Sequence, residues 1–303
     1  MSLIAFLGAV EIGLLFGLVA LGVYISFRIL NFPDLTVDGS LPLGAGVAAV
    51  LLMAGVNPYL ATLAAFFAGA AAGLVTAWLN VRLKILHLLA SILTMIALFS
   101  INLRVMGRPN IALLGQDTVF TPFESLGLPY YWVNPLVLVV VVIAAKLLLD
   151  RFLLSETGLA MRATGANQRM ARAQGIDTGR MTLLGIALSN GMVAFAGALF
   201  AQLQGGADIT MGVGVIVIGL AAVILGEAVM STRTIILATI ACIIGSVLYR
   251  LMVALALNAD VLGLQAQDLK LITAVLVVAA MTLPGMRRKL KLKSLTTGGG
   301  VRK

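Results

Sequence analysis

Long apolar runs separated by short polar or charged stretches make up most of the chain. The runs lie near residues 4–27, 41–55, 58–79, 86–104, 134–153, 181–203, 211–229, 234–256 and 268–284. Most are long enough for a helix to cross the hydrocarbon core of a bilayer, and their Leu, Val, Ala and Gly residues do not alternate with polar ones as in barrel strands. The pattern predicts an all-α polytopic membrane protein with nine apolar spans.

One polar stretch, RILNFPDLTVDGSLPLG at residues 28–44, follows the first run. An extended chain at roughly 3.3 Å per residue covers a core of ~30 Å in about ten residues, but protein or water must then surround its backbone. If the stretch crosses, the count becomes ten and the stretch lines a pathway. Polar and ionisable residues at membrane depth usually face a cavity, so Asn31, Asp34, Thr36 and Asp38 are candidate pathway residues.

The same stretch has a second interpretation, in which its residues end one helix and begin the next. Pro33 would stop the first helix, and Asp38 or Ser40 would cap the second. Pro42 would lie in the first turn, where no amide donor is missed. The two interpretations are compatible with each other.

The composition agrees with a membrane protein and makes metal chemistry improbable. Of the 303 residues, 61% are hydrophobic and 11% are charged, and the mean hydropathy is +1.09, outside the range of ordinary soluble domains. The single cysteine, Cys242, excludes an intramolecular disulfide, and the single histidine, His87, does not suit a His-rich or Cys-rich metal site. We expect no metal site.

The net charge of +9 can be explained by the distribution of the basic residues along the chain. If residues 81–85, 146–180, 230–234 and the tail share one side, that side holds 16 of the 21 Lys and Arg residues. Such an excess marks the cytoplasmic face. The excess of basic residues is therefore explained by the lipid membrane as the partner, and no nucleic-acid partner is expected.

Three further charged residues are candidates for contacts with substrate or partners. Glu11 lies in the first span, where a buried structural hydrogen bond to a partner helix is favoured. The alternatives are that it reaches towards a headgroup region or touches a cationic substrate group in the pathway. Asp208 and Arg108 fall on the external side, where they would seat a binding protein. A turn role is the alternative for Asp208.

Residues 154–180 form a polar, basic cytoplasmic stretch longer than the usual turns of a helical bundle. Good helix formers at 160–173, with Gly165 among them, predict a short surface helix, and Gly175 is a plausible residue for ending it. The length indicates a partner. A solvated loop held by lipid headgroups is the alternative.

The string GLAMRATGANQRMARAQGIDTGRMTLLGIALSNGMVAFAGALFAQLQG resembles the permease subunits of bacterial ABC importers for branched-chain amino acids and ribose-like sugars. In that family a G-x-N-x-x-x-A-x-x-x-G-I pattern opens the cytoplasmic coupling segment. The matching residues here are Gly165, Asn167, Ala171, Gly175 and Ile176. The resemblance implies that these residues dock on a separate ATPase.

Residues 30–39, LNFPDLTVDG, resemble a second motif of the same superfamily and mark a subgroup for which aromatic amino acids are among the suggested substrates. The resemblance covers residues 1–285 as one transmembrane permease domain with its coupling segment at about 155–180. A basic cytoplasmic tail follows at 286–303. The resemblance implies a multi-pass protein of the bacterial inner membrane with ten crossings, one of them broken, and both termini inside.

No G-x-x-x-x-G-K-[ST] phosphate loop occurs, so ATP would be bound by the partner and this chain would carry no cofactor. No catalytic constellation is discernible either, so the chain is not expected to be an enzyme. The implied partners are a second permease copy, a cytoplasmic ATPase dimer and an extracytoplasmic substrate-binding protein.

Other functions remain compatible with the sequence. A secondary transporter would show charged residues near the midplane and broken helices in both halves. An ABC permease for a sugar or nucleoside, and a scaffold that does not transport, are further alternatives. The residues alone do not identify the substrate.

Overall fold

The structure is a computed structural model that describes residues 3–124, 129–257, 274–275 and 278. The predicted run at 268–284 falls almost wholly outside the described residues, and the tail at 286–303 falls wholly outside them.

Nearly every predicted run is a helix. The elements in chain order are α1 (Leu3–Val23), the π-helix η1 (Tyr24–Ile29), α2 (Val37–Met53), α3 (Pro58–Leu83), α4 (His87–Met106), β1 (Asn110–Ala112), α5 (Thr121–Glu124), α6 (Tyr130–Leu154), α7 (Glu156–Ala166), α8 (Gln168–Ala173), α9 (Thr178–Gln204), β2 (Gly206–Asp208), α10 (Val215–Val229) and α11 (Ile235–Leu257). Within the described residues, five apolar helices are long enough to cross a membrane, and α2 and α10 are shorter.

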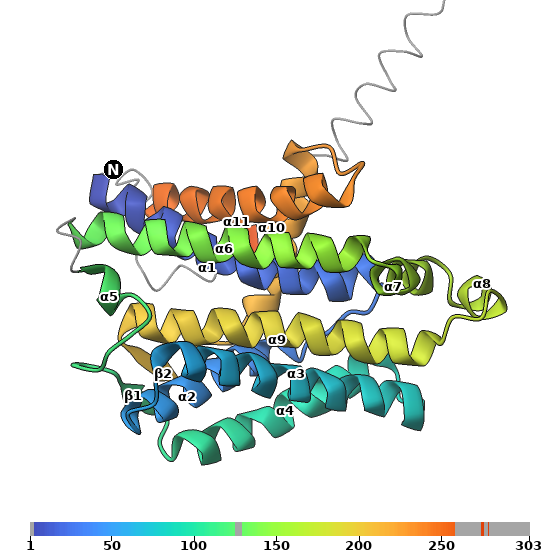
Figure 1. The fold of residues 1–303 in the computed structure, drawn as a ribbon, viewed down its shortest axis with the longest axis horizontal. Helices are drawn as coiled ribbons and strands as arrows, with labels where there is room; N and C mark the ends of the chain where they lie inside the picture. The colour runs from blue at the N-terminus through green and yellow to red at the C-terminus, as the bar shows by residue number, and fades with distance from the viewer. Residues whose placement is uncertain (1–2, 125–128, 258–273, 276–277, 279–303) are drawn as a thin grey trace, which may run out of the picture.

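The helices form layers around α9, which contacts α1, α2 and α3 (Figure 1). Helices α1, α6 and α11 lie on one side of α9, and α2, α3 and α4 lie on the other. The N-terminus is at the opposite end of the bundle from α7 and α8. The Arg and Lys residues at the α7–α8 end mark it as cytoplasmic, so the described N-terminal end of α1 is external.

Small residues bring the central helices close together. A Cβ at Gly69 or Gly73 in α3 would collide with the backbone of α9, at Asn190 and Ile186 respectively. These two glycines form the GxxxG pattern of α3, which lets two helix backbones approach in the way common in membrane proteins. The same holds at Gly226, which packs against the backbone of Ala241 in α11.

The polar stretch breaks the chain at residues 30–36, and α2 begins only at Val37. Ser40 Oγ donates to Asn190 Oδ1 at 2.6 Å, and Asn190 is the middle of the 27-residue helix α9. Helix α2 therefore starts half-way along the bundle, and its 17 residues cover about 25 Å at 1.5 Å per residue. Residues 30–36 and α2 together make one crossing, so the structure does not confirm ten crossings with an internal N-terminus.

The predicted caps differ from those observed. The first helix ends at Ile29, before Pro33, because the chain turns at Asn31, whose φ is +53°. Thr36 precedes α2, and both Ser40 and Pro42 lie inside that helix. The cap interpretation was therefore wrong for Ser40. Its hydroxyl instead binds another helix.

The external end carries a small sheet that the hydrophobic pattern does not predict. Strands β1 and β2 pair antiparallel, with Asn110 opposite Asp208 and Ala112 opposite Gly206. At the cytoplasmic end, the predicted helix at 160–173 is two helices, α7 and α8. They meet at Asn167, whose extended backbone ends α7 and whose side chain caps α8.

Candidate functional site

A buried polar cluster lies where residues 30–36 meet α9. Asp34 Oδ2 accepts from Asn190 Nδ2 at 2.6 Å, and Asp34 Oδ1 accepts from the Thr36 amide at 2.9 Å. Thr36 Oγ1 is 2.8 Å from Thr76 Oγ1 of α3. Together with Ser40, these side chains join three elements. All are almost completely buried, so the cluster fixes the path of the break inside the bundle.

Asp34 carries a carboxyl that is 2% exposed and forms no ion pair with a described residue. A buried carboxylate is costly unless hydrogen bonds or a cation compensate it. Its two hydrogen-bond donors are neutral. The site can thus stabilise a passing cationic or donor group, or hold the break in place, and the geometry is compatible with either role.

Asp38 binds the beginning of another short helix. Its carboxylate oxygens accept from the amides of Gly214 at 3.0 Å and Ile216 at 2.8 Å, at the N-terminus of α10. Free amides and the helix dipole make such an end favourable for a negative charge. The prediction that Asp38 caps α2 was therefore wrong, since Asp38 lies inside that helix and its carboxylate caps α10. The N-termini of two short helices meet at this residue.

Two other predicted pathway residues lie apart from this cluster. Asn31 is exposed near the cytoplasmic end of the break. Glu11 is half-buried in α1 and hydrogen-bonds to Asn134 of α6. Glu11 lies in the external half of α1, so the structure does not bring it together with Asp34.

Helix α7, which carries the predicted coupling motif, packs directly against the end of η1. A Cβ at Gly165 of α7 would collide with the carbonyl oxygen of Ile29 and would lie 2.9 Å from Leu30 Cα. Leu30 in turn fills the space over Gly185 of α9. The G-x-N motif therefore places its glycine on the two residues that open the break.

The rest of the motif shapes α8. Asn167 accepts the Met170 amide at 3.1 Å, and Ala171 is 3% exposed against the bundle. Gly175 has φ +81°, and the Ile176 amide donates to Ala171 O at 3.0 Å. This is the glycine-terminated helix end that the sequence predicts.

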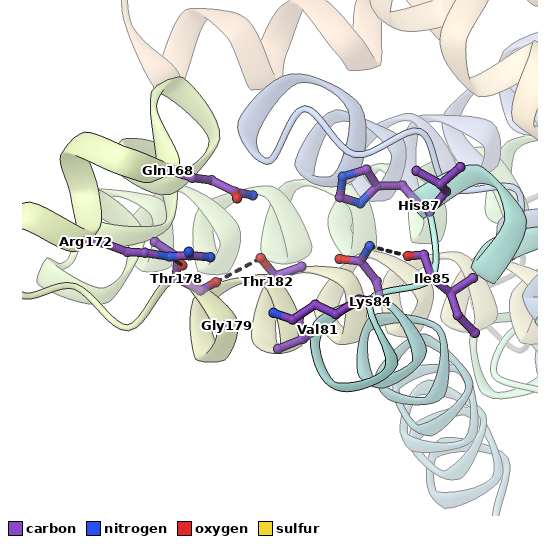
Figure 2. A pocket seen from close by; sticks show the side chains of 11 residues that line it. Val81, Lys84, Ile85, His87, Gln168, Arg172, Thr178, Gly179 and Thr182 are labelled. Carbon is purple, nitrogen blue, oxygen red and sulfur yellow. Dashed lines mark hydrogen bonds between the residues drawn. The ribbon is translucent and has the colours of Figure 1, made fainter.

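A cavity of about 220 Å³ lies between α8 and the turn from α3 to α4 (Figure 2). Lys84 and Arg172 line it, and Arg172 Nε donates to Thr178 Oγ1 at 2.7 Å. His87 also lines it, and its ring meets that of Phe32 edge-on at 4.5 Å between centroids. The cavity thus lies between α8 and a histidine that contacts Phe32 of the break, and Lys84 and Arg172 give it positive charge.

At the external end, the structure brings the two predicted docking residues onto one surface. The Ile209 amide donates to Pro109 O at 3.0 Å, which holds the chain after Asp208 beside the chain after Arg108. Hydrogen bonds from the hydroxyl and amide of Thr210 lower the pKa of Asp208, and Asn110 adds a weaker one. Asp208 therefore does have the turn role, on an exposed surface that also presents Arg108.

Some polar contacts were not predicted. Asp150 of α6 pairs with Lys146 at 2.5 Å and accepts from Thr239 of α11 at 2.7 Å. Arg28 of η1 pairs with Glu227 of α10, with Nε 2.7 Å from Oε1. Isolated polar residues inside apolar runs are the signal that could have identified Lys146 and Asp150, since such residues usually find partners in the bundle.

Comparisons with known proteins match the chain to transport permeases. A family model described as branched-chain amino acid transport system / permease component matches residues 6–282. The chain is 39% identical over 279 residues to the tyrosine transport system permease protein of Clostridioides difficile (strain R20291), covering 92% of this chain and 90% of that protein.

Two further relatives and one solved structure are less similar in sequence. An uncharacterized protein of Rickettsia prowazekii (strain Madrid E) is 32% identical over 86% of this chain and 91% of its own length. A probable branched-chain amino acid transport permease protein LivH of Methanocaldococcus jannaschii is 27% identical over 65% of each chain. Among solved structures, PsaBC from Streptococcus pneumoniae in complex with Fab matches with a TM-score of 0.56 and 13% identity. That match covers 95% of this chain and 94% of the other, and shows a shared fold alone.

Proposed function

Because the chain belongs to the family of branched-chain amino acid transport system permease components, we propose that it is the membrane subunit of an ATP-driven importer for an aromatic amino acid. Family membership makes it a multi-pass membrane permease for amino acid transport. Import, ATP as the energy source and the aromatic preference are the proposed parts. The last rests on the similarity to the tyrosine transport permease.

The contact of Gly165 with Ile29 carries the proposal of ATP coupling. Helices α7 and α8 lie at the cytoplasmic end, where a soluble ATPase would reach them. A displacement of α7 cannot be absorbed at Gly165, since backbone lies against backbone there. It would be transmitted to Leu30 and from there to the break. Movement of an ATPase dimer would in this way change the inner half of a crossing.

The partners follow from the same arrangement. An ATPase dimer requires two permease surfaces, so two copies of this chain would form the transporter, with the pathway candidates Asn31, Asp34, Thr36, Asp38 and Glu11 in each copy. The basic cavity at Lys84 and Arg172 suits acidic residues of the ATPase. The surface carrying Arg108 and Asp208 would receive an extracytoplasmic binding protein.

A secondary transporter is the second candidate, and one observation favours it. Helices α2 and α10 are both short and apolar, and their N-termini meet at Asp38. Discontinuous helices whose ends meet at a binding site are typical of ion-coupled transporters.

Energy dependence separates the two candidates. The chain would be reconstituted in proteoliposomes with a candidate ATPase and a candidate binding protein from the same organism, and uptake of radiolabelled L-tyrosine would be measured. We expect uptake to require hydrolysable ATP, to persist with an ionophore, and to fall to background with a non-hydrolysable ATP analogue. Uptake that survives without ATP and stops with the ionophore would support the secondary transporter.

A further inference from the structure

A second cavity, of about 410 Å³, lies between α2, α4 and the connection from β2 to α10. Its volume falls within the roughly 300–1,000 Å³ usual for small-molecule sites. Asp38, at mid-depth of the bundle, lies on its wall, and so does Asn102, close to the external end of α4. The cavity is therefore in the external half, and a molecule entering from outside would meet it before the break at 30–36.

Asn102 has a hydrogen-bond acceptor that no described residue satisfies. Its side chain is 1% exposed, and Nδ2 donates to Gly39 O at 3.1 Å. This bond sets the orientation of the amide, because the flipped amide would place two oxygens against each other. Oδ1 is then buried without a partner within the described part of the chain. A buried acceptor without a donor is rare in native proteins and marks the place where a donor belongs.

The charge and the apolar lining define the complementary ligand. Asp38 is the charged residue of the wall, and no described Lys or Arg lines the cavity. The carboxylate oxygens of Asp38 already accept hydrogen bonds from backbone amides at the start of α10, and a carboxylate, with about four lone-pair sites, has room for a further donor. Met95 and Phe99 supply apolar surface beside these acceptors. Such a wall suits a cation that donates hydrogen bonds and carries an apolar, aromatic body.

We propose that this cavity is a substrate site that binds the primary ammonium group of an aromatic amine or amino acid through Asn102 and Asp38, with the ring packed on Met95 and Phe99. The inference rests on the proposed function, since an aromatic amino acid carries both features. Among the described lining residues there is no Lys or Arg for the ligand's carboxylate to pair with. The site therefore recognises the amine end of the substrate and disregards the acid end.

Binding to the purified full chain in lipid nanodiscs, without ATPase or binding protein, tests this assignment. The probes are L-tyrosine, tyramine, which lacks the carboxylate, and 3-(4-hydroxyphenyl)propionate, which lacks the amine. We expect saturable binding of L-tyrosine and tyramine, and binding of the acid at least about tenfold weaker, because a charged hydrogen bond is lost. Equal binding of all three probes, or binding of none, would overturn the proposal.

Two variants locate the site. Asn102→Leu removes the unpaired acceptor, and we expect it to weaken tyramine binding about tenfold or more. Phe99→Ala, on a side chain that is 54% exposed, changes the ring contact with little demand on folding and should also weaken binding. Phe67→Ala is the matched control, because Phe67 is 62% exposed on α3 and does not line this cavity. Unchanged binding in both Asn102→Leu and Phe99→Ala contradicts the assignment.

The binding measurement is independent of the energy source. Tyramine binding that depends on Asn102 supports the site even if uptake proves not to need ATP. ATP-driven uptake of L-tyrosine by Asn102→Leu and Phe99→Ala at the unmodified rate, at subsaturating substrate, counts against the site and leaves the importer intact.

Discussion

Replacement of Gly165 with leucine is expected to reduce ATP-driven L-tyrosine uptake to a small fraction of the unmodified rate while the protein remains in the membrane. The new side chain would force α7 away from Ile29 and Leu30. Overpacking of this kind costs about 1–3 kcal/mol. If this free-energy cost applies to only one of the transporter's two conformations, it changes the equilibrium constant between them by about 5- to 150-fold. ATPase activity should persist and no longer respond to substrate.

Gly8→Leu is the matched control, because a Cβ at Gly8 of α1 meets no atom within 4 Å. That variant should transport as the unmodified protein does. Uptake and ATPase activity would be measured together in the same proteoliposomes. If Gly165→Leu transports at the normal rate, coupling does not pass through this contact.

Removal of the Asp34 carboxyl is the second large expected effect. Asp34→Ala takes away the acceptor for the Thr36 amide and for Asn190 Nδ2. An unsatisfied buried donor costs about 1–3 kcal/mol, so we expect a lower unfolding temperature in nanodiscs and less folded protein. Total uptake should fall at least in proportion to the loss of folded protein.

Asp34→Asn separates structure from transport. It keeps the size of the side chain and one acceptor oxygen, but removes the negative charge that a pathway role requires. We expect uptake per folded permease to fall by about tenfold, the equivalent of roughly 1.4 kcal/mol, with a smaller change in unfolding temperature than for Asp34→Ala. If neither variant alters uptake per folded protein, Asp34 has a structural role alone.

The features that depend on local sequence were predicted well. The apolar runs form helices, because a helix pairs its backbone N–H and C=O groups within the same segment and needs no distant partner for them. The break was indicated by Pro33 and two aspartates in an apolar context, and Gly175 by its place after a run of helix formers. Family membership followed from the coupling motif, whose residues are close together in the chain.

The features that depend on distant contacts were not predictable from one sequence. Asp38 caps a helix 176 positions further on, and Ser40 meets Asn190 across 150 positions. Nothing near residues 37–40 indicates that α2 begins in the middle of the bundle. The count of ten crossings depended on that depth. The three-residue strands β1 and β2 are likewise too short to show a pattern of their own.

The pairing of Arg28 with Glu227 has a consequence when it is taken together with Asp38. Arg28 holds the last turn of α10 and Asp38 holds the first, so both ends of one rigid helix are fastened to points ten positions apart in the chain. Residues 28 and 38 are thus both bound to α10, one at each end of that helix. A change of state that moves either end of the break away from α10 would therefore have to open the Arg28–Glu227 pair or the Asp38 cap.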